Sequence, residues 1–245
     1  MSWKIKSRIE SFDVQPNGNV KISALLKLFQ KAAGDELLDT PFSFFNLARR
    51  NVAFVLTKMT LKIIKDIKIY DELEIITHPR KIHGATYPRD FIVKVGGETV
   101  AVARSMWVLL DIENRHILRP SAIADLGEIP TSEADLFEIE DVRRIVDQAS
   151  LLRTDVRDVK YSNLDMNNHL NNTYYSDFVF DCFNHNERTS DAGLYLQINY
   201  KNEARLGDVL EISSNVDSSD ADAWDFSACC QGTDKICFTA FIKYQ

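Results

Sequence analysis

Two segments of the chain carry apolar side chains at the spacing of one buried helix face. Residues 14–33 and 164–183 align without a gap when the chain is shifted by 150 residues. In each segment, apolar residues recur at i, i+3, i+4, i+7 and i+8, which predicts an amphipathic helix with one buried side. The two sets are Leu25, Leu28, Phe29, Ala32 and Ala33, then Tyr175, Phe178, Val179, Cys182 and Phe183.

Strand-like segments follow each predicted helix and repeat at a second offset, 137 residues. Residues 63–75 align with 200–212, and both segments end in the pattern Asp-x-Leu-Glu-Ile. Alternating apolar and polar residues at 194–200 and 235–244, with glycine turn signals between strands, are typical of antiparallel sheets. The order of a helix followed by strands therefore occurs twice, which indicates an internal duplication. The smaller offset places about 13 additional residues between helix and strands in the first copy.

One helix followed by antiparallel strands, present twice, predicts an α+β protein of a specific kind. We predict a tandem, or double, hotdog, in which each half is an antiparallel sheet wrapped around a central helix. The N-terminal half is expected at 1–125 and the C-terminal half at 149–245. Residues 126–148, which are acidic and irregular in pattern, are predicted to be a linker that crosses from one half to the other.

Composition limits the classes of function. The 245 residues are 45% hydrophobic, enough for a substantial core, and the net charge is −7. Nucleic acid is not an expected partner, because its binding relies on basic surface. The chain shows neither a secretion signal nor a run of about 18 apolar residues, so we expect no membrane span and a soluble, cytoplasmic protein.

Cysteine and histidine spacing gives no sign of a metal centre. The four cysteines lack a CxxC pair and the five histidines lack an HExxH pattern, so we expect buried free thiols, no metal and no cofactor.

The start of the second predicted helix is unusually polar. Residues 164–172 read "LDMNNHLNN", and in a D-x-N-x-H pattern on an extended segment alternate side chains would face one pocket. Such a loop alone is more often a turn and helix cap, and we assign Asn171 and Asn172 that structural role. Ser23 and Thr173 stand where a hydroxyl accepts hydrogen bonds from the first-turn amides, so we predict that both cap their helices.

Two motifs together resemble a known family. The segments "LDMNNHLNN" and "INYKNEAR" are similar to those of acyl-acyl carrier protein (ACP) thioesterases, the plant plastid enzymes and their bacterial relatives. In the first half, "FVLTKMTLKI", "YPRDFIV" and "ARSMWVLLDIENRH" also fall in the family's order. The resemblance implies a tandem hotdog that hydrolyses fatty acyl-ACP to free fatty acid and holo-ACP in fatty acid biosynthesis, with ACP as partner and no cofactor.

The resemblance also implies four catalytic residues, Asp165, Asn167, His169 and Glu203. Thioester hydrolysis needs a base to activate water and donors to hold the oxyanion. Either carboxylate can be the base or nucleophile, while the amide and imidazole orient and polarise. A cysteine nucleophile is disfavoured, because Ala204 stands where some relatives have cysteine, unless Cys182 reaches the pocket.

The first copy lacks this acid–base set. Gln15, Asn17 and Asn19 align with Asp165, Asn167 and His169, and Asp66 aligns with Glu203. We therefore expect one active site, in the C-terminal half, and an N-terminal half that holds the acyl chain.

Other functions stay open at this point. The motif D-x-N-x-H-x-N-N also occurs in hotdog acyl-coenzyme A thioesterases, which are the nearest alternative. A hotdog dehydratase is a further enzyme class, and a non-catalytic acyl-binding hotdog protein is an alternative outside the enzymes. ACP docking would require a local basic patch such as Arg49 with Arg50, or Lys4, Lys6 and Arg8. A homodimer is left open.

Overall fold

The computed structural model describes residues 2–131, 137, 139, 153–182, 190–216 and 222–244. Its α-helices are α1 (Ile22–Leu37), α2 (Phe44–Ala48) and α3 (Tyr174–Asp181). The strands of the first half are β1 (Trp3–Arg8), β2 (Val52–Ile63), β3 (Glu72–Pro79), β4 (Thr86–Val95), β5 (Glu98–Asp111) and β6 (Ile117–Leu118). Those of the second half are β7 (Arg153–Asp158), β8 (Leu194–Tyr200), β9 (Val209–Val216), β10 (Ala223–Cys230) and β11 (Ile236–Tyr244).

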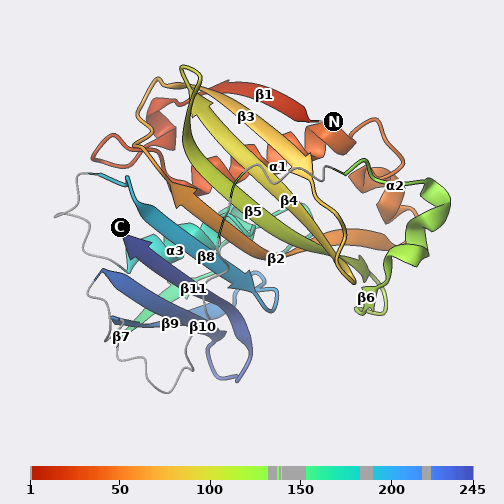
Figure 1. Ribbon diagram of the computed structural model, residues 1–245. Helices are drawn as coiled ribbons and strands as arrows, with labels where there is room; N and C mark the ends of the chain where they lie inside the picture. Colours follow the sequence, from red (N-terminus) through yellow and green to blue (C-terminus); the bar gives the residue numbers. More distant parts are fainter. Residues whose placement is uncertain are drawn as a thin grey trace.

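All these strands form one antiparallel sheet with internal symmetry. Its order is β1-β3-β4-β5-β2-β8-β11-β10-β9-β7, with β6 paired to β5. Apart from β6, each first-half strand has a second-half counterpart at the same distance from its own edge of the sheet. The halves join where β2 pairs with β8, for example Met59 with Ile198. This arrangement confirms the tandem hotdog (Figure 1).

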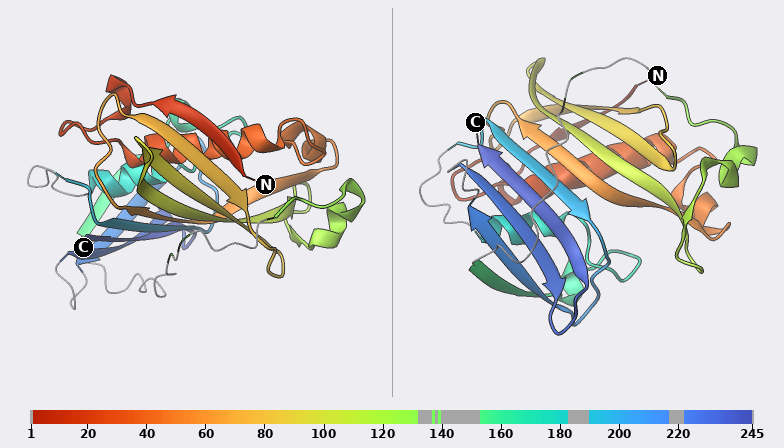
Figure 2. Two further views of the ribbon diagram at one scale, coloured as in Figure 1. Left: turned by 45° about the horizontal axis from the view of Figure 1, so that its top comes forward. Right: turned by 60° about the horizontal axis from the view of Figure 1, so that its bottom comes forward.

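The sheet curves around α1 and α3, which lie on the same face of it (Figure 2). Leu25, Phe29 and Ala32 on α1 are buried, and Phe29 stacks on Phe91 of β4 with ring centroids 4.7 Å apart. The corresponding face of α3 is buried too, through Tyr175, Phe178, Val179 and Cys182. The predicted stripes therefore face the core, with Leu28 and Ala33 partly buried against it, while Phe183 lies outside the described residues.

The predicted capping hydrogen bonds are not formed, although Thr173 is the N-cap residue of α3. Lys21 precedes α1 as its N-cap, so Ser23 lies inside the helix, where its hydroxyl bonds to Asp177 of α3. Thr173 precedes α3, but its hydroxyl donates to the side-chain oxygen of Asn171 at 2.8 Å. That same oxygen accepts the Thr173 amide at 3.0 Å, so Asn171 shapes the entry to the helix. The hydroxyls fail as caps because each has a competing partner.

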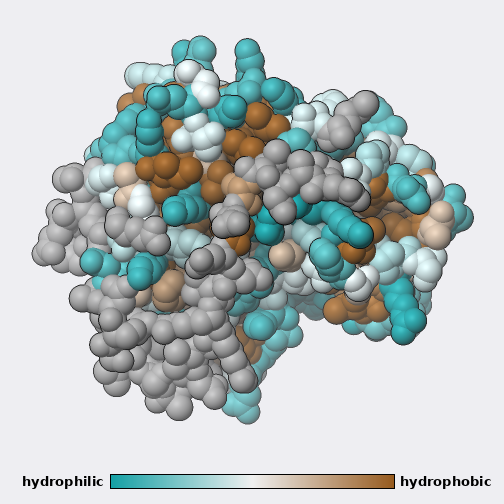
Figure 3. All heavy atoms as spheres, viewed as in Figure 1, coloured by the Kyte–Doolittle hydropathy of each residue, from teal (hydrophilic) through white to brown (hydrophobic). Residues whose placement is uncertain are grey.

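The additional residues of the first half contain α2, which packs beside β2 and lines the cleft described below. Most of the predicted linker, 126–148, lies outside the described residues, but Phe137 and Ile139 are placed. Phe137 lies under the guanidinium of Arg104 at 5.7 Å, and Ile139 packs against a second-half cluster that includes Tyr195 and Phe241. Figure 3 shows this outward face, where apolar side chains gather over the first-half strands with polar ones around them.

Membrane-spanning helices were sought among the described residues, and none is long and apolar enough. The longest helix, α1, has 16 residues, whereas a bilayer core requires about 20.

Candidate active site

A large cleft lies at the junction of the two halves, with a volume of about 1420 Å³. This exceeds the roughly 300–1,000 Å³ of ordinary small-molecule pockets and suits a long, flexible ligand. Its apolar wall comes from the first half: Ala33, Leu37, Phe42, Leu47, Phe54 and Trp107. Its polar end comes mainly from the second half and includes Asp165, Asn167, His169 and Glu203. All four residues predicted as catalytic therefore line the same cleft.

Backbone pairing brings the motif residues together. His169 lies in the loop before α3, and Glu203 lies between β8 and β9. An isolated antiparallel bridge between His169 and Arg205 joins the two segments, and the Leu170 amide donates to the Ala204 carbonyl at 2.8 Å. As a result, His169 Nε2 lies 3.1 Å from Glu203 Oε2.

The expectation that the D-x-N-x-H segment is extended is wrong. The segment forms a tight turn, in which the Asp165 amide donates to the His169 carbonyl at 2.8 Å and Asn168 has φ of +60°. Asp165 Oδ1 accepts the amides of Asn167 at 2.8 Å and His169 at 3.2 Å. Aspartate and asparagine favour such turns because their short side chains bond the nearby backbone. The turn, not a strand, brings these side chains to the cleft.

Glu203 is held by cationic and imidazole groups on one of its two oxygens. Its Oε2 contacts His169, forms an ion pair with Nη2 of Arg115, and lies 3.9 Å from Nη2 of Arg205. Arg115 belongs to the turn between β5 and β6, so it reaches the site from the other half. The sequence analysis missed Arg115, because only the fold brings residues 115 and 203 together.

Two tyrosines, Tyr175 buried and Tyr200 partly buried, line the site beside α3. Tyr175 and Tyr200 pack edge to face with centroids 5.5 Å apart, and the Tyr200 hydroxyl donates to the Asn172 carbonyl at 3.2 Å. Burial raises the pKa of both phenols, so both are neutral donors at physiological pH. The side chain of Asn172 also accepts a hydrogen bond from Gln30 of α1. Asn171 and Asn172 thus make the structural bonds expected of them, although both also line the cleft.

The cysteines lie apart from this chemistry. All four are buried free thiols, as expected. Cys182 Sγ lies 3.2 Å from the Phe178 carbonyl and 3.8 Å from Asp155 Oδ2, and no cysteine is among the described residues that line the cleft. A cysteine nucleophile next to His169 therefore has no support in the described residues.

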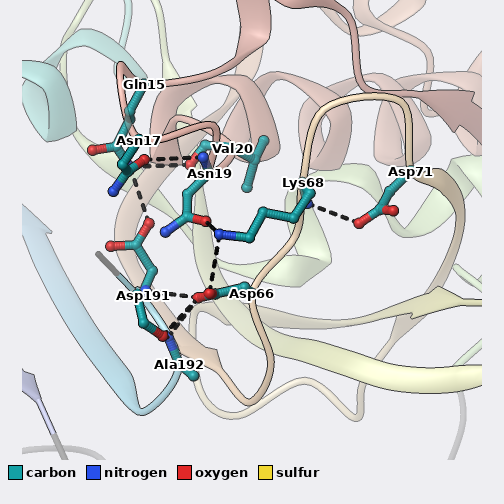
Figure 4. A network of polar contacts seen from close by, with 10 residues as sticks. Gln15, Asn17, Asn19, Val20, Asp66, Lys68, Asp71, Asp191 and Ala192 are labelled. Atoms are coloured by element: carbon teal, nitrogen blue, oxygen red, sulfur yellow. Dashed lines mark hydrogen bonds and ion pairs between the residues drawn. The ribbon is translucent and has the colours of Figure 1, made fainter. Parts of the chain in front are cut away.

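The equivalent place in the first half has the same backbone but other contacts (Figure 4). An isolated bridge joins Asn19 to Lys68. These residues are the counterparts of His169 and Arg205, at the sequence offsets of 150 and 137. Lys68 Nζ bonds to Asn19 and lies 3.2 Å from Asp66 Oδ2, the counterpart of Glu203.

A loop from the second half occupies this first-half position. Asp66 Oδ1 accepts the amides of Asp191 at 2.7 Å and Ala192 at 3.0 Å, and the hydroxyl of Ser190 at 2.9 Å. Gln15 donates to Asp191 Oδ2 at 3.1 Å. These contacts tie the halves together where the second half has its cleft.

Comparison with known families agrees with this architecture. The acyl-ACP thioesterase N-terminal domain matches residues 1–125, and the acyl-ACP thioesterase C-terminal domain matches residues 149–238. The chain belongs to the acyl-ACP thioesterase family.

Individual relatives are distant in sequence. Oleoyl-acyl carrier protein thioesterase 2, chloroplastic, of Arabidopsis thaliana is 22% identical in an alignment of 227 positions that covers 86% of this chain and 62% of that protein. The chain thus spans about three-fifths of the length of this curated relative.

Solved structures show the same fold. An acyl-ACP thioesterase from Bacteroides thetaiotaomicron superposes with a TM-score of 0.82 at 21% identity, over 100% of this chain and 98% of that one. The 12:0-ACP thioesterase from Umbellularia californica superposes with a TM-score of 0.79 at 17% identity, over 100% of this chain and 97% of that one. Both likenesses confirm the tandem hotdog.

Proposed function

We propose that the protein hydrolyses the thioester of fatty acyl-ACP, releasing free fatty acid and holo-ACP in fatty acid biosynthesis. The observation that carries this proposal is the His169–Glu203 pair at the polar end of a long apolar cleft, in a chain of the acyl-ACP thioesterase family. The apolar wall suits the acyl chain, and the polar end suits the thioester carbonyl. The related proteins named as acyl-ACP thioesterases support the same substrate class.

In this proposal Glu203 is the general base. Glu203 lines the cleft, where its carboxylate takes a proton from water as the water oxygen attacks the thioester carbon. Asn167, exposed at the cleft, donates its side-chain amide to the oxyanion. The C–S bond then breaks, and the proton held by Glu203 passes to the thiolate of the phosphopantetheine arm.

Asp165 is the alternative base or nucleophile, and its contacts favour a different role. Its Oδ1 already accepts two amides of its own turn, which stabilises the turn that carries Asn167 and His169. We therefore assign Asp165 to positioning these two residues, and Glu203 to the proton transfer.

The carrier protein would approach the polar end of the cleft. Lys201, Arg205 and Lys235 line it there and give a basic rim for an acidic partner. The patches suggested by the sequence are partly neutralised, since Arg50 pairs with Asp125 at 2.7 Å and Arg8 with Glu10 at 2.9 Å. The cytoplasmic location and the half boundaries remain predictions from sequence, and a homodimer is still left open.

The test compares one acyl group on two carriers. The purified protein is incubated with palmitoyl-ACP and with palmitoyl-coenzyme A, and released fatty acid is measured by mass spectrometry. We expect a higher kcat/KM on the ACP substrate. A higher kcat/KM on the coenzyme A substrate would indicate the acyl-coenzyme A thioesterase, and binding without cleavage of either thioester would indicate an acyl-binding protein.

A further inference from the structure

Arg115 is the one first-half side chain that forms an ion pair with Glu203 in the described part of the chain. We propose that Arg115 is a positioning residue for the proposed reaction, which fixes the Glu203 carboxylate from the opposite half of the molecule. The inference rests on the proposed thioesterase function, because it assigns a role to Arg115 only through Glu203.

The turn that carries Arg115 is built to hold its backbone in place. The Arg115 amide donates to the Asp111 carbonyl at 2.9 Å, and Arg115 adopts a left-handed φ of +58°. Asp111 Oδ1 accepts the Asn114 amide at 2.8 Å and the Asn51 side chain at 3.0 Å. A left-handed residue other than glycine is uncommon and persists where the surroundings determine it. The guanidinium is therefore presented to the second half from a fixed turn.

The contact limits how the Glu203 carboxylate can rotate. Arg115 and His169 both bind Oε2, so the carboxylate is held at two points and its rotation is restricted. The restricted carboxylate is then kept in the orientation that the proton transfer requires. Without Arg115, the 3.1 Å contact with His169 is the remaining close one, because Arg205 Nη2 lies 3.9 Å away on a side chain that is 65% exposed.

The same contact contributes little to folding. The Arg115 side chain is 46% exposed, and ion pairs between exposed side chains contribute little to protein stability. A change at Arg115 should therefore affect turnover more than stability. This separates a positioning role from a structural one.

The experiment measures kcat and KM on acyl-ACP separately for Arg115→Gln, Arg115→Lys and a control, Lys65→Gln. The control removes another exposed ion pair of the first half, Lys65 with Glu98 at 2.7 Å, away from the cleft. We expect Arg115→Gln to lower kcat about tenfold and to change KM less than about twofold. A tenfold loss is only part of the roughly 10²–10⁴-fold acceleration that general-base catalysis typically provides, because Glu203 itself is still present. Arg115→Lys should recover most of the loss, and Lys65→Gln should match the wild type.

If the wild type is active, three outcomes would overturn the inference but not the proposed function. These are an unchanged kcat in Arg115→Gln, an effect of Arg115→Gln confined to KM, or no recovery of kcat in Arg115→Lys. An inactive wild type would overturn the proposed function and the inference with it. Thermal unfolding of each variant, expected within about 2 °C of the wild type for so small a change in stability, shows that the kinetic differences come from folded protein.

Discussion

Asn19 and Asp66 are joined by Lys68 at the backbone positions where, in the second half, His169 bonds directly to Glu203. The two halves thus share one backbone arrangement with different chemistry. Lys68 contacts one oxygen of Asp66 and the 190–192 loop bonds to the other, so this carboxylate stabilises the fold and does not line the cleft. In the second half, by contrast, Glu203 contacts His169 and both residues line the cleft.

The backbone at residue 169 does not require histidine, because asparagine holds the equivalent position in the first half. We therefore expect His169→Asn to fold like the wild type but to lose the donor to Glu203 Oε2. The kcat on acyl-ACP should fall about 100-fold, the lower end of typical acid–base contributions. Steady-state kinetics with circular dichroism tests this. A folded variant with wild-type kcat would show that His169 is dispensable.

The Asp66 carboxylate should contribute stability that depends on pH. Burial raises the pKa of Asp66, but hydrogen bonds from Asp191, Ser190 and Lys68 outweigh that effect, so the pKa lies below its ordinary value. A depressed pKa means that the stabilisation is present above the unfolded value of about 3.9 and is lost as the pH falls through the folded value.

Asp66→Asn should accordingly lower the free energy of unfolding at pH 7 by about 1 kcal/mol, the difference between charged and neutral hydrogen bonds. The difference in the free energy of unfolding between this variant and the wild type should become smaller below about pH 4. Thermal unfolding from pH 7 to pH 3 measures it, with Glu72→Gln as the control for net charge. A difference in stability between variant and wild type that stays constant over this pH range would contradict a stabilising role of the Asp66 charge.

Gly34 on α1 lines the cleft, and a Cβ atom added there would meet no atom within 4 Å outside the neighbouring helix backbone. Gly34→Leu should fill part of the cavity and shift the preferred substrate toward shorter acyl chains. Gly34→Ala is the matched control, because it adds about 0.5–1 kcal/mol of helix stability with little lost volume. The measurement is kcat/KM across acyl-ACPs of increasing length. Identical length profiles for the leucine variant and the wild type would place the acyl chain elsewhere.

The sequence was sufficient to predict the duplication, the two helical stripes and the location of the polar motif. These features depend on periodicity and on offsets of 150 and 137, which the bridges at Asn19–Lys68 and His169–Arg205 reproduce. The predicted capping hydrogen bonds and the extended conformation of the motif were wrong, because short polar side chains can bond to several nearby partners. Arg115 was not predictable, since 88 residues separate it from Glu203 in sequence.

The most direct test of the central claim compares the two equivalent carboxylates. Glu203→Gln and Asp66→Asn remove the same charge at matched positions of the two halves, and their kcat on acyl-ACP is measured well below the unfolding temperature of each. We expect at least a 100-fold loss for Glu203→Gln, as for removal of a general base, and less than about a twofold change for Asp66→Asn. Wild-type turnover in Glu203→Gln, or equal losses in both variants, would contradict a single active site centred on Glu203.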